Sequence, residues 1–326
     1  MPIIDVHNHF YPPAYLDALR RGPSAVRVTE DEQGNPCLHY PGDYNVAVRG
    51  HRDIDYREQV LADEGVDLQV ISLTTPGTHV EEPARAAELA RAVNDDFAAI
   101  ARDRPRFAAF ATLPLNDPAA SADELERAVR ELGLPGAMVF SNVNGVALAD
   151  DRFLPLWERA DDLGCIIHIH PTDPVGVAAM TEFWLMPLVG FLMDTTLAAA
   201  HLVFRGIPER FPRIRWILGH LGGAIPYLAE RLDRGWRAFP DCRAHIDRPP
   251  SAYLKRFYYD GVNFDADALR LAIRFAGAGP ILAGSDYPHQ IGSIRLMKET
   301  LSGAGPDEDE RSAISGANAA RLLGVE

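Results

Sequence analysis

Eight short apolar runs alternate with longer stretches of helical pattern along this chain, and this alternation constrains its fold most strongly. The runs cover residues 2–6, 68–73, 107–113, 136–140, 165–170, 214–218, 257–260 and 280–285. Helix-like stretches lie at 55–65, 83–104, 118–132, 151–163, 186–206, 223–238 and 265–277, and two more follow the last run. Runs that are apolar on both faces predict parallel strands covered on both sides. Eight such units predict an α/β fold, specifically a (β/α)8 TIM barrel, ahead of an open doubly wound sheet.

Residues 12–50 depart from the alternation, because they hold prolines, glycines and short polar runs. We expect them to form a small insertion after the first strand, over the mouth of the barrel. The sequence has no internal repeat, low-complexity tract or long linker, and single α/β barrels reach this length. Residues 1–326 are therefore predicted to form a single barrel domain.

Composition restricts the partners of the protein. The formal net charge of -14 makes binding to nucleic acid or to an anionic membrane surface unfavourable. The apolar segment 183–204 is interrupted by proline, aspartate and histidine, so we interpret it as a buried helix rather than a membrane span. Three widely spaced cysteines and no N-terminal secretory signal predict a reduced protein of the cytoplasm.

Histidines and an aspartate stand where the predicted strands end. His7 and His9 end the first strand, His170 the fifth and His220 the sixth, while Asp286 ends the eighth. Active-site groups of barrels lie at these carboxyl ends, because the loops there build the pocket. A single strand histidine is more simply read as a satisfied core residue. A set of five such groups instead predicts a functional site.

The stretch IIDVHNHF suggests what this site holds. Alternate residues of a strand face the same side, so the imidazoles of His7 and His9 can converge on one cation. A third histidine and a carboxylate from other strands would complete its ligands and leave room for water or substrate. Such a set suits zinc, and also manganese, iron or cobalt.

The ordered set of motifs resembles the amidohydrolase superfamily. Its most specific pieces are VHNHF, HPTD, FWLMPLVGFLMDTT, ERFPRIRWILGHLGGAIPYLAERLDRG and GSDYPH. More narrowly, the chain is similar to the branch of 2-amino-3-carboxymuconate-6-semialdehyde decarboxylases and resorcylate decarboxylases. The likeness extends over nearly the whole chain.

The resemblance implies a role for each matching residue. The metal ligands would be His7, His9, His170 and Asp286. His220 would be the catalytic histidine that activates metal-bound water or moves protons near the substrate, and Asp286 would take part in catalysis.

Substrate binding is implied for three further residues. Arg231 matches an arginine that reaches across a dimer interface to a substrate carboxylate. Arg49 matches a second carboxylate-binding arginine, and Trp184 lies in a matching motif. Without the resemblance, both arginines would be read as solvated surface charges. The Arg231 match and the apolar stretch from Trp184 to Phe191 predict a homodimer.

The chain also departs from the pattern of two-metal hydrolytic members. They carry a lysine at the end of strand four, whereas this chain has GAMVFSNVNG there, which favours one metal. His168 is read as a core residue or a support for the ligands, and His289 as a support or a solvated loop residue. The glycines of GHLGG do not fit a phosphate-loop pattern and are expected to form a close turn.

Two arginines and a metal suit an anionic substrate, because arginine grips a carboxylate with paired hydrogen bonds. The resemblance implies metal-dependent, non-oxidative decarboxylation of a conjugated or aromatic carboxylic acid. The alternative is a hydrolase that attacks a lactone, an amide or a C–C bond with metal-activated water, since the ligand set allows both. A third reading is a metal-binding barrel without catalytic activity.

Overall fold

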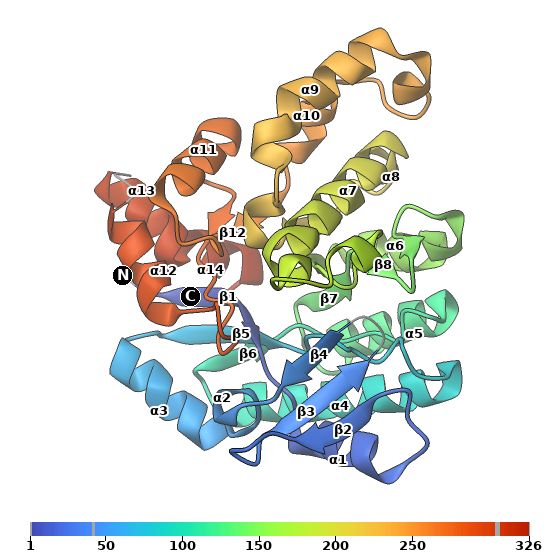
Figure 1. Ribbon diagram of the computed structural model, residues 1–326. Helices are drawn as coiled ribbons and strands as arrows, with labels where there is room; N and C mark the ends of the chain where they lie inside the picture. Colours follow the sequence, from blue (N-terminus) through green and yellow to red (C-terminus); the bar gives the residue numbers. More distant parts are fainter. Residues whose placement is uncertain (1, 41–42, 304–306, 326) are drawn as a thin grey trace.

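Eight parallel strands form the centre of the fold in the computed structural model, which describes residues 2–40, 43–303 and 307–325 (Figure 1). They are β1 (Ile4–His9), β5 (Leu68–Ser72), β6 (Phe107–Ala109), β7 (Gly136–Phe140), β10 (Ile166–His170), β11 (Arg215–Leu218), β12 (Tyr258–Asp260) and β13 (Ile281–Leu282). The predicted strand runs and the α/β class are confirmed. Almost every residue of these strands is buried, as expected for parallel strands covered on both faces.

The strands pair in two parallel sheets, in the orders β1-β5-β6 and β13-β12-β11-β10-β7. Single parallel bridges connect the two sheets, from Ala111 to Ala137 on one side and from Asn8 to Tyr287 on the other. The second connection carries further hydrogen bonds, because the amides of Ser285 and Asp286 both donate to the carbonyl of His7, at 3.1 and 2.8 Å.

Helices surround the strands (Figure 1). The main ones are α3 (Ile54–Glu64), α4 (Pro83–Asp103), α5 (Pro118–Arg130), α6 (Leu154–Leu163), α7 (Phe191–Phe204), α9 (Ile225–Ala238), α11 (Ala266–Ala276) and α12 (Ile294–Gly303). Shorter helices are α1 (Pro13–Arg21), α2 (Arg49–Arg52), α8 (Ile207–Arg210), α10 (Pro250–Leu254), α13 (Glu308–Ser312) and α14 (Asn318–Leu323). Their starts follow local rules: Asp117 caps α5 by accepting the amides of Ala119 and Ala120, and Pro118 occupies the first turn.

Residues between β1 and α3 form a separate antiparallel sheet of β2 (Arg27–Glu30), β3 (Pro36–Tyr40) and β4 (Asp43–Val46), next to α1 and α2. This sheet, α1 and the start of α2 fall within residues 12–50, the range predicted to be an insertion; residues 41 and 42 lie outside the described residues. A second, two-residue hairpin follows β7, with β8 (Asn142–Val143) and β9 (Val146–Ala147).

The apolar segment before β11 differs from the prediction of a buried helix. A π-helical turn, Met186–Gly190, precedes α7, and the stretch Met186–Phe204 is long and apolar enough to cross a membrane by length and composition alone. Only 44% of its most apolar window is buried. One side packs inward through residues such as Thr195 and Leu202, whereas Met193 and Leu197 are exposed. The prediction was therefore right for one side of the helix.

Two buried polar side chains hold the connection between β1 and β13. Asp5 accepts hydrogen bonds from Gln69 Nε2 at 2.7 Å and from the amide and hydroxyl of Ser285 at 3.0 and 2.6 Å. Arg57 donates to the carbonyl of His9 at 2.8 Å and to that of Tyr287 at 3.1 Å. Burial lowers the pKa of Arg57 to about 10, so it stays charged at neutral pH. These bonds fix the strand ends that carry His7, His9 and Asp286.

Replacing Asp5 by alanine should therefore destabilise the protein substantially. The change leaves Gln69 and Ser285 without their buried acceptor, and we expect a loss of roughly 3 kcal/mol in the free energy of unfolding. Urea denaturation of Asp5→Ala and of Asp123→Ala, an exposed aspartate of α5, measures this difference. A loss as small as that of the Asp123 variant, expected within about 0.5 kcal/mol, would show that the connection does not depend on Asp5.

Candidate functional site

His7 and His9 lie on one side of β1, as the alternation of a strand requires. Both are fully buried, and their ring centroids are 5.0 Å apart. Asn8 points the other way, and its side-chain amide donates to the carbonyls of Asp5 and Val70. The strand therefore presents two imidazoles on one side. The residue between them, Asn8, forms hydrogen bonds to the backbone on the other side.

β10 supplies a second alternating pair, His168 and His170. His170 Nδ1 lies 2.7 Å from the carbonyl oxygen of Pro171, so it donates that hydrogen bond and leaves Nε2 free to act as a ligand. The His170 ring is 5.1 Å from His7 and 4.7 Å from His9. His168 lies deeper and contacts Asp260 instead, with Nε2 at 3.2 Å from the carboxylate. This agrees with the reading of His168 as a support.

His220 and Asp286 occupy strained turns directly after β11 and β13. Both have a positive φ, of 54° and 53°, which costs a residue with a side chain about 1–2 kcal/mol. The predicted close turn of GHLGG is present, because a Cβ on Gly223 would collide with the carbonyl oxygen of Leu192. The strain directs both side chains toward the histidines of β1, with His220 Nε2 3.9 Å from Asp286 Oδ2.

Asp260, at the end of β12, is a central member of the site that the sequence analysis missed. Its carboxylate accepts hydrogen bonds from His7 Nδ1 at 2.6 Å, His168 Nε2 at 3.2 Å and the amide of His220 at 2.8 Å. Burial alone would raise the pKa of Asp260, but the charge of His7 and the bonds from His168 and His7 lower it. A signal was present, since the run FYYD ends in an acid at the same point where other strands end in site residues.

The negative charge of Asp260 changes the pKa of His7. Burial would lower the pKa of His7, yet the neighbouring Asp260 raises it to about 10. Because Nδ1 is bonded to Asp260, the proton that remains free to leave is the one on Nε2, which is buried and makes no hydrogen bond within the described part of the chain. A buried polar nitrogen without a partner is costly, and a cation would satisfy it.

The side chains fit a divalent cation. The ligand atoms of His7, His170, His220 and Asp286 all lie within 4.8 Å of one another, and so do those of His9, Asp286 and His289. Asp286 Oδ1 is 3.4 Å from His7 Nε2 and 3.1 Å from His9 Nε2. Two atoms bound to one zinc ion at about 2.1 Å lie about 3.4 Å apart in tetrahedral geometry. The structure thus brings three of the predicted ligands, His7, His170 and Asp286, together with His220, and it places the fourth, His9, beside Asp286 and His289.

A pocket of about 300 Å3 opens above these groups. Its walls come mainly from the insertion, from the segment before α7 and from the loop after β13. It is lined by Tyr44, Asn45, Val46, Val48, His51, Thr74, Thr75, His170, Trp184, Pro187, Leu188, Phe191, His220, Asp286, Pro288, His289, Gln290 and Ile291. No lysine or arginine is among these lining residues. Apolar walls around a few convergent polar groups are typical of a small-molecule site.

The predicted substrate-binding residues are placed differently from one another. Trp184 lines the pocket, and its ring lies 5.8 Å from that of Tyr44 across the mouth. Arg49 does not line the pocket, because it is exposed on α2 and its Nε donates to Asp53 at 2.8 Å. Arg231 is exposed on α9 and does not line the pocket of its own chain either.

Two further histidines of the pocket, His51 and His289, are packed together. Their ring centroids are 4.9 Å apart, and the His289 ring is also 4.9 Å from that of His9. His51 is almost fully buried, and neither of its ring nitrogens has a hydrogen-bond partner among the residues that the structure describes. Burial, with His289 and the charge of Arg57 nearby, holds the pKa of His51 well below its usual range. His51 lies in the short helix α2 and belongs to no motif, so no signal in the sequence pointed to it.

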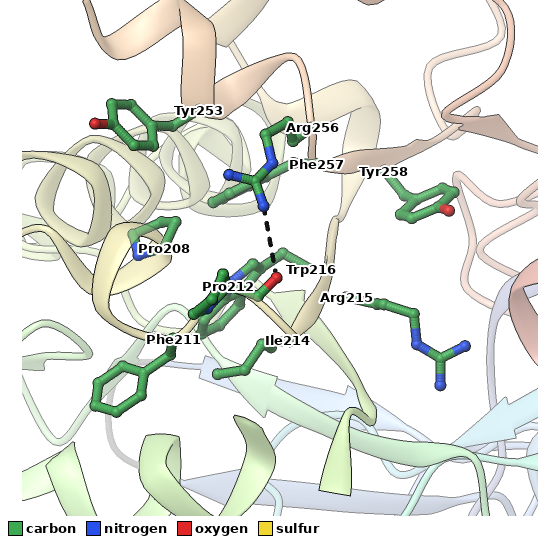
Figure 2. Close-up of a pocket in the computed structure, with 10 residues that line it drawn as sticks. All are labelled: Pro208, Phe211, Pro212, Ile214, Arg215, Trp216, Tyr253, Arg256, Phe257 and Tyr258. Carbon is green, nitrogen blue, oxygen red and sulfur yellow. Dashed lines mark hydrogen bonds between the residues drawn. The ribbon is translucent and has the colours of Figure 1, made fainter. Parts of the chain in front are cut away.

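A second pocket, of about 190 Å3, lies at the opposite ends of the strands (Figure 2). It is lined by Arg215 and Tyr258, which begin β11 and β12, and by apolar residues such as Phe211 and Phe257. Arg256 closes one side by donating to the carbonyl of Pro212. Its lining contains no histidine and no carboxylate, so it offers none of the chemistry gathered at the other end.

Comparisons with known proteins agree with this arrangement. The family model described as Amidohydrolase matches residues 4–325. The chain is 34% identical over 278 residues to 2-amino-3-carboxymuconate-6-semialdehyde decarboxylase of Dictyostelium discoideum, covering 84% of this chain and 77% of that protein. The crystal structure of 5-carboxyvanillate decarboxylase from Sphingomonas paucimobilis superposes with a TM-score of 0.87, at 28% identity over 100% and 99% of the two chains.

A third similar protein is a dihydroxybenzoic acid decarboxylase from a Polaromonas species. Its crystal structure matches with a TM-score of 0.83 and 27% identity, over 99% of this chain and 97% of that one. That structure holds manganese and the inhibitor 2-nitroresorcinol.

Asp260→Asn should weaken metal binding without removing a metal ligand. The amide cannot carry the negative charge that orients His7, and loss of such a support typically lowers metal affinity about 10–100-fold. Competition with a fluorescent chelator measures the affinity for zinc and manganese. The matched control is Asp267→Asn, an exposed aspartate of α11, which should leave the affinity unchanged. Equal affinities for both variants would contradict the role assigned to Asp260.

Proposed function

The chain belongs to the amidohydrolase family, and we propose that it is a metal-dependent decarboxylase that removes carbon dioxide from an aromatic or conjugated carboxylic acid without an oxidant. One observation carries the proposal: three histidines and Asp286 converge at the floor of a pocket whose walls are otherwise apolar or neutral. The kind of reaction is supported by the similar decarboxylases of carboxymuconate semialdehyde, carboxyvanillate and dihydroxybenzoate.

We propose that the eight strands close into one (β/α)8 barrel that forms a single domain over residues 1–326. Support comes from the bridges at both edges of the two sheets, which connect β6 to β7 and β13 to β1. In such a barrel the site lies at the carboxyl ends of the strands. The positions of His9, His170, His220 and Asp286 agree with this arrangement. The antiparallel sheet β2–β4 then covers one side of the mouth, since β4 contributes Tyr44, Asn45 and Val46 to the pocket.

One divalent cation is proposed at this site, with zinc as the first choice and manganese, iron or cobalt as alternatives. Its ligands would be His7, His9, His170 and Asp286. When bound, the cation would supply positive charge that stabilises the negative charge on substrate oxygens. The chain's own contribution is to hold these ligands in place, through the bond of His7 to Asp260 and that of His170 to Pro171.

Proton transfer is assigned to His220 and Asp286. A proton is added to the carbon that bears the carboxylate, which interrupts conjugation there. The C–C bond then breaks, its electrons restore the conjugated system, and carbon dioxide leaves. His220 is placed for this task, because it lines the pocket beside Asp286 and its Nδ1 has no partner within the described protein. Walls such as Phe191 and Leu188 keep water from the carbon.

We also propose that the protein is a cytoplasmic homodimer that binds a small carboxylate and neither nucleic acid nor membrane. Support for a reducing compartment comes from three free cysteines. Support for a dimer comes from exposed apolar side chains, among them Phe183 and Tyr227, each 78% exposed. Tyr227 lies one turn before Arg231 on α9, so both project from the same side of the helix. A partner chain packed against this side of α9 would place Arg231 at the interface. There it could reach the carboxylate of a substrate bound in the partner chain.

Light scattering after size exclusion tests the dimer. We expect the wild-type protein at micromolar concentration to have twice the mass of one chain, and Tyr227→Lys to shift it toward a single chain. Leu271→Lys, on the outer side of α11, is the matched control and should remain dimeric. A single-chain mass for the wild type would contradict the proposal and the role of Arg231 across an interface.

Release of carbon dioxide from a panel of hydroxybenzoates and carboxymuconate semialdehydes tests the function. The zinc- or manganese-loaded protein should release carbon dioxide from at least one acid, and chelation should abolish the release. His220→Asn should lower turnover about 10²–10⁴-fold while metal content stays near that of the wild type.

His201→Asn, an exposed histidine on α7, is the control for this experiment and should keep full turnover. Full turnover in the His220 variant would overturn its assignment to proton transfer. Loss of metal from that variant would instead make His220 a ligand, as its place among the clustered atoms allows. Hydrolysis of lactones or esters with no release of carbon dioxide would replace the decarboxylase by the hydrolase.

A further inference from the structure

The pair His51–His289 is a polar feature of the pocket that the proposed reaction does not use. Both residues line the pocket, and their ring centroids are 4.9 Å apart in an edge-on arrangement with an interplanar angle of 60°. His51 is 1% exposed, and both of its ring nitrogens lack a hydrogen-bond partner among the described residues. A buried imidazole with two unsatisfied nitrogens is costly, so its presence calls for a ligand in the pocket.

Thr74 repeats the observation on the same wall. Its hydroxyl is completely buried, lines the pocket and has no hydrogen-bond partner within the described protein. The neighbouring polar residues are different, since Thr75 Oγ1 accepts hydrogen bonds from Tyr40 at 2.9 Å and from Asn45 at 3.1 Å. Polar groups without a hydrogen bond within the described protein are thus found at His51 and Thr74, whereas the neighbouring side chains of Thr75 and Asn45 are hydrogen-bonded.

The charge of the pocket restricts what these groups can bind. Among the residues that line it there is no lysine or arginine, and Asp286 contributes a negative charge at its floor. A second carboxylate of a substrate, buried beside His51, would meet no lysine or arginine among the residues that line the pocket, because the nearby Arg57 lies outside the lining and donates to the carbonyls of His9 and Tyr287. Such burial is unfavourable. A hydroxyl group is neutral and both donates and accepts, which matches the one donor and one acceptor of a neutral imidazole.

We propose that His51 and His289 form a subsite that binds a hydroxyl substituent on the ring of the substrate. The subsite adjoins the metal site, because His289 lies within 4.8 Å of the ligand atoms of His9 and Asp286. It selects hydroxylated monocarboxylic acids over dicarboxylic acids. This inference rests on the proposed function for its substrate class and replaces the expectation that Arg49 binds a second carboxylate.

Probes that carry a nitro group in place of the reacting carboxylate separate this proposal from the reaction. In 2-nitrophenol a nitro group takes the place of the carboxylate, and its analogues carry a second hydroxyl at each other ring position, 2-nitroresorcinol among them. A further probe, 4-hydroxy-3-nitrobenzoate, carries a carboxylate instead. Titration calorimetry with the metal-loaded protein measures the dissociation constant of each.

We expect one dihydroxy isomer to bind about 10-fold more tightly than 2-nitrophenol, and the carboxylated probe to bind no more tightly than 2-nitrophenol. The ratio of the dissociation constant of 2-nitrophenol to that of this dihydroxy isomer should fall close to one in His51→Phe and in His289→Phe. His51→Gln, which keeps a donor and an acceptor, should retain part of it. His201→Phe is the matched control on the surface of α7 and should keep the full ratio.

Three results would overturn the subsite: no dihydroxy isomer binds more tightly than 2-nitrophenol, the carboxylated probe binds most tightly, or the ratio survives in both phenylalanine variants. Failure of the proposed function would be seen separately, as no release of carbon dioxide from any acid, while the ratio of the nitro probes could still be measured.

Discussion

The buried carboxylate of Asp260 is the interaction on which the rest of the site depends. It accepts hydrogen bonds from His7, His168 and the amide of His220, and so ties together the ends of β1, β10 and β11. A carboxylate without exposure to water is tolerated only because these donors surround it. Its negative charge also orients His7 so that Nε2 faces Asp286. Without Asp260, His7 and His168 would lie at the same strand ends but would lose the acceptor that orients their rings.

A second constraint is the contrast between the floor of the pocket and its walls. The floor is lined by His170, His220 and Asp286, with His7 and His9 beside them, whereas the described residues that line the pocket include no lysine or arginine. A carboxylate held by this chain alone must therefore find its positive charge at the floor. The carboxylate of the substrate would therefore both bind and react at the floor. The neutral pair His51–His289 would contact the substituents on the rest of the substrate ring.

Much of this could be predicted from the sequence, because it is encoded locally. The strands follow from apolar runs, and the site residues follow from the rule that parallel strands place their carboxyl ends together, which found His7, His9, His170, His220 and Asp286. What was missed depends on contacts between distant segments. Asp260 is one acid among many until β12 is placed beside β11. His51 lies in the short helix α2, whose position is set by packing against Tyr11 and His289. The expectation for Arg49 came from a short match around that same helix and stays a prediction; in the structure Arg49 is exposed and paired with Asp53.

The central claim is that the clustered histidines and Asp286 deliver a proton to carbon and release carbon dioxide. The most direct test is mass spectrometry of a single turnover in water labelled with deuterium and oxygen-18, using the metal-loaded protein and its best acid. The account predicts one deuterium on the carbon that held the carboxylate and no oxygen-18 in the organic product. Oxygen-18 in the organic product, with the carboxylate retained, would contradict it and identify a hydrolase.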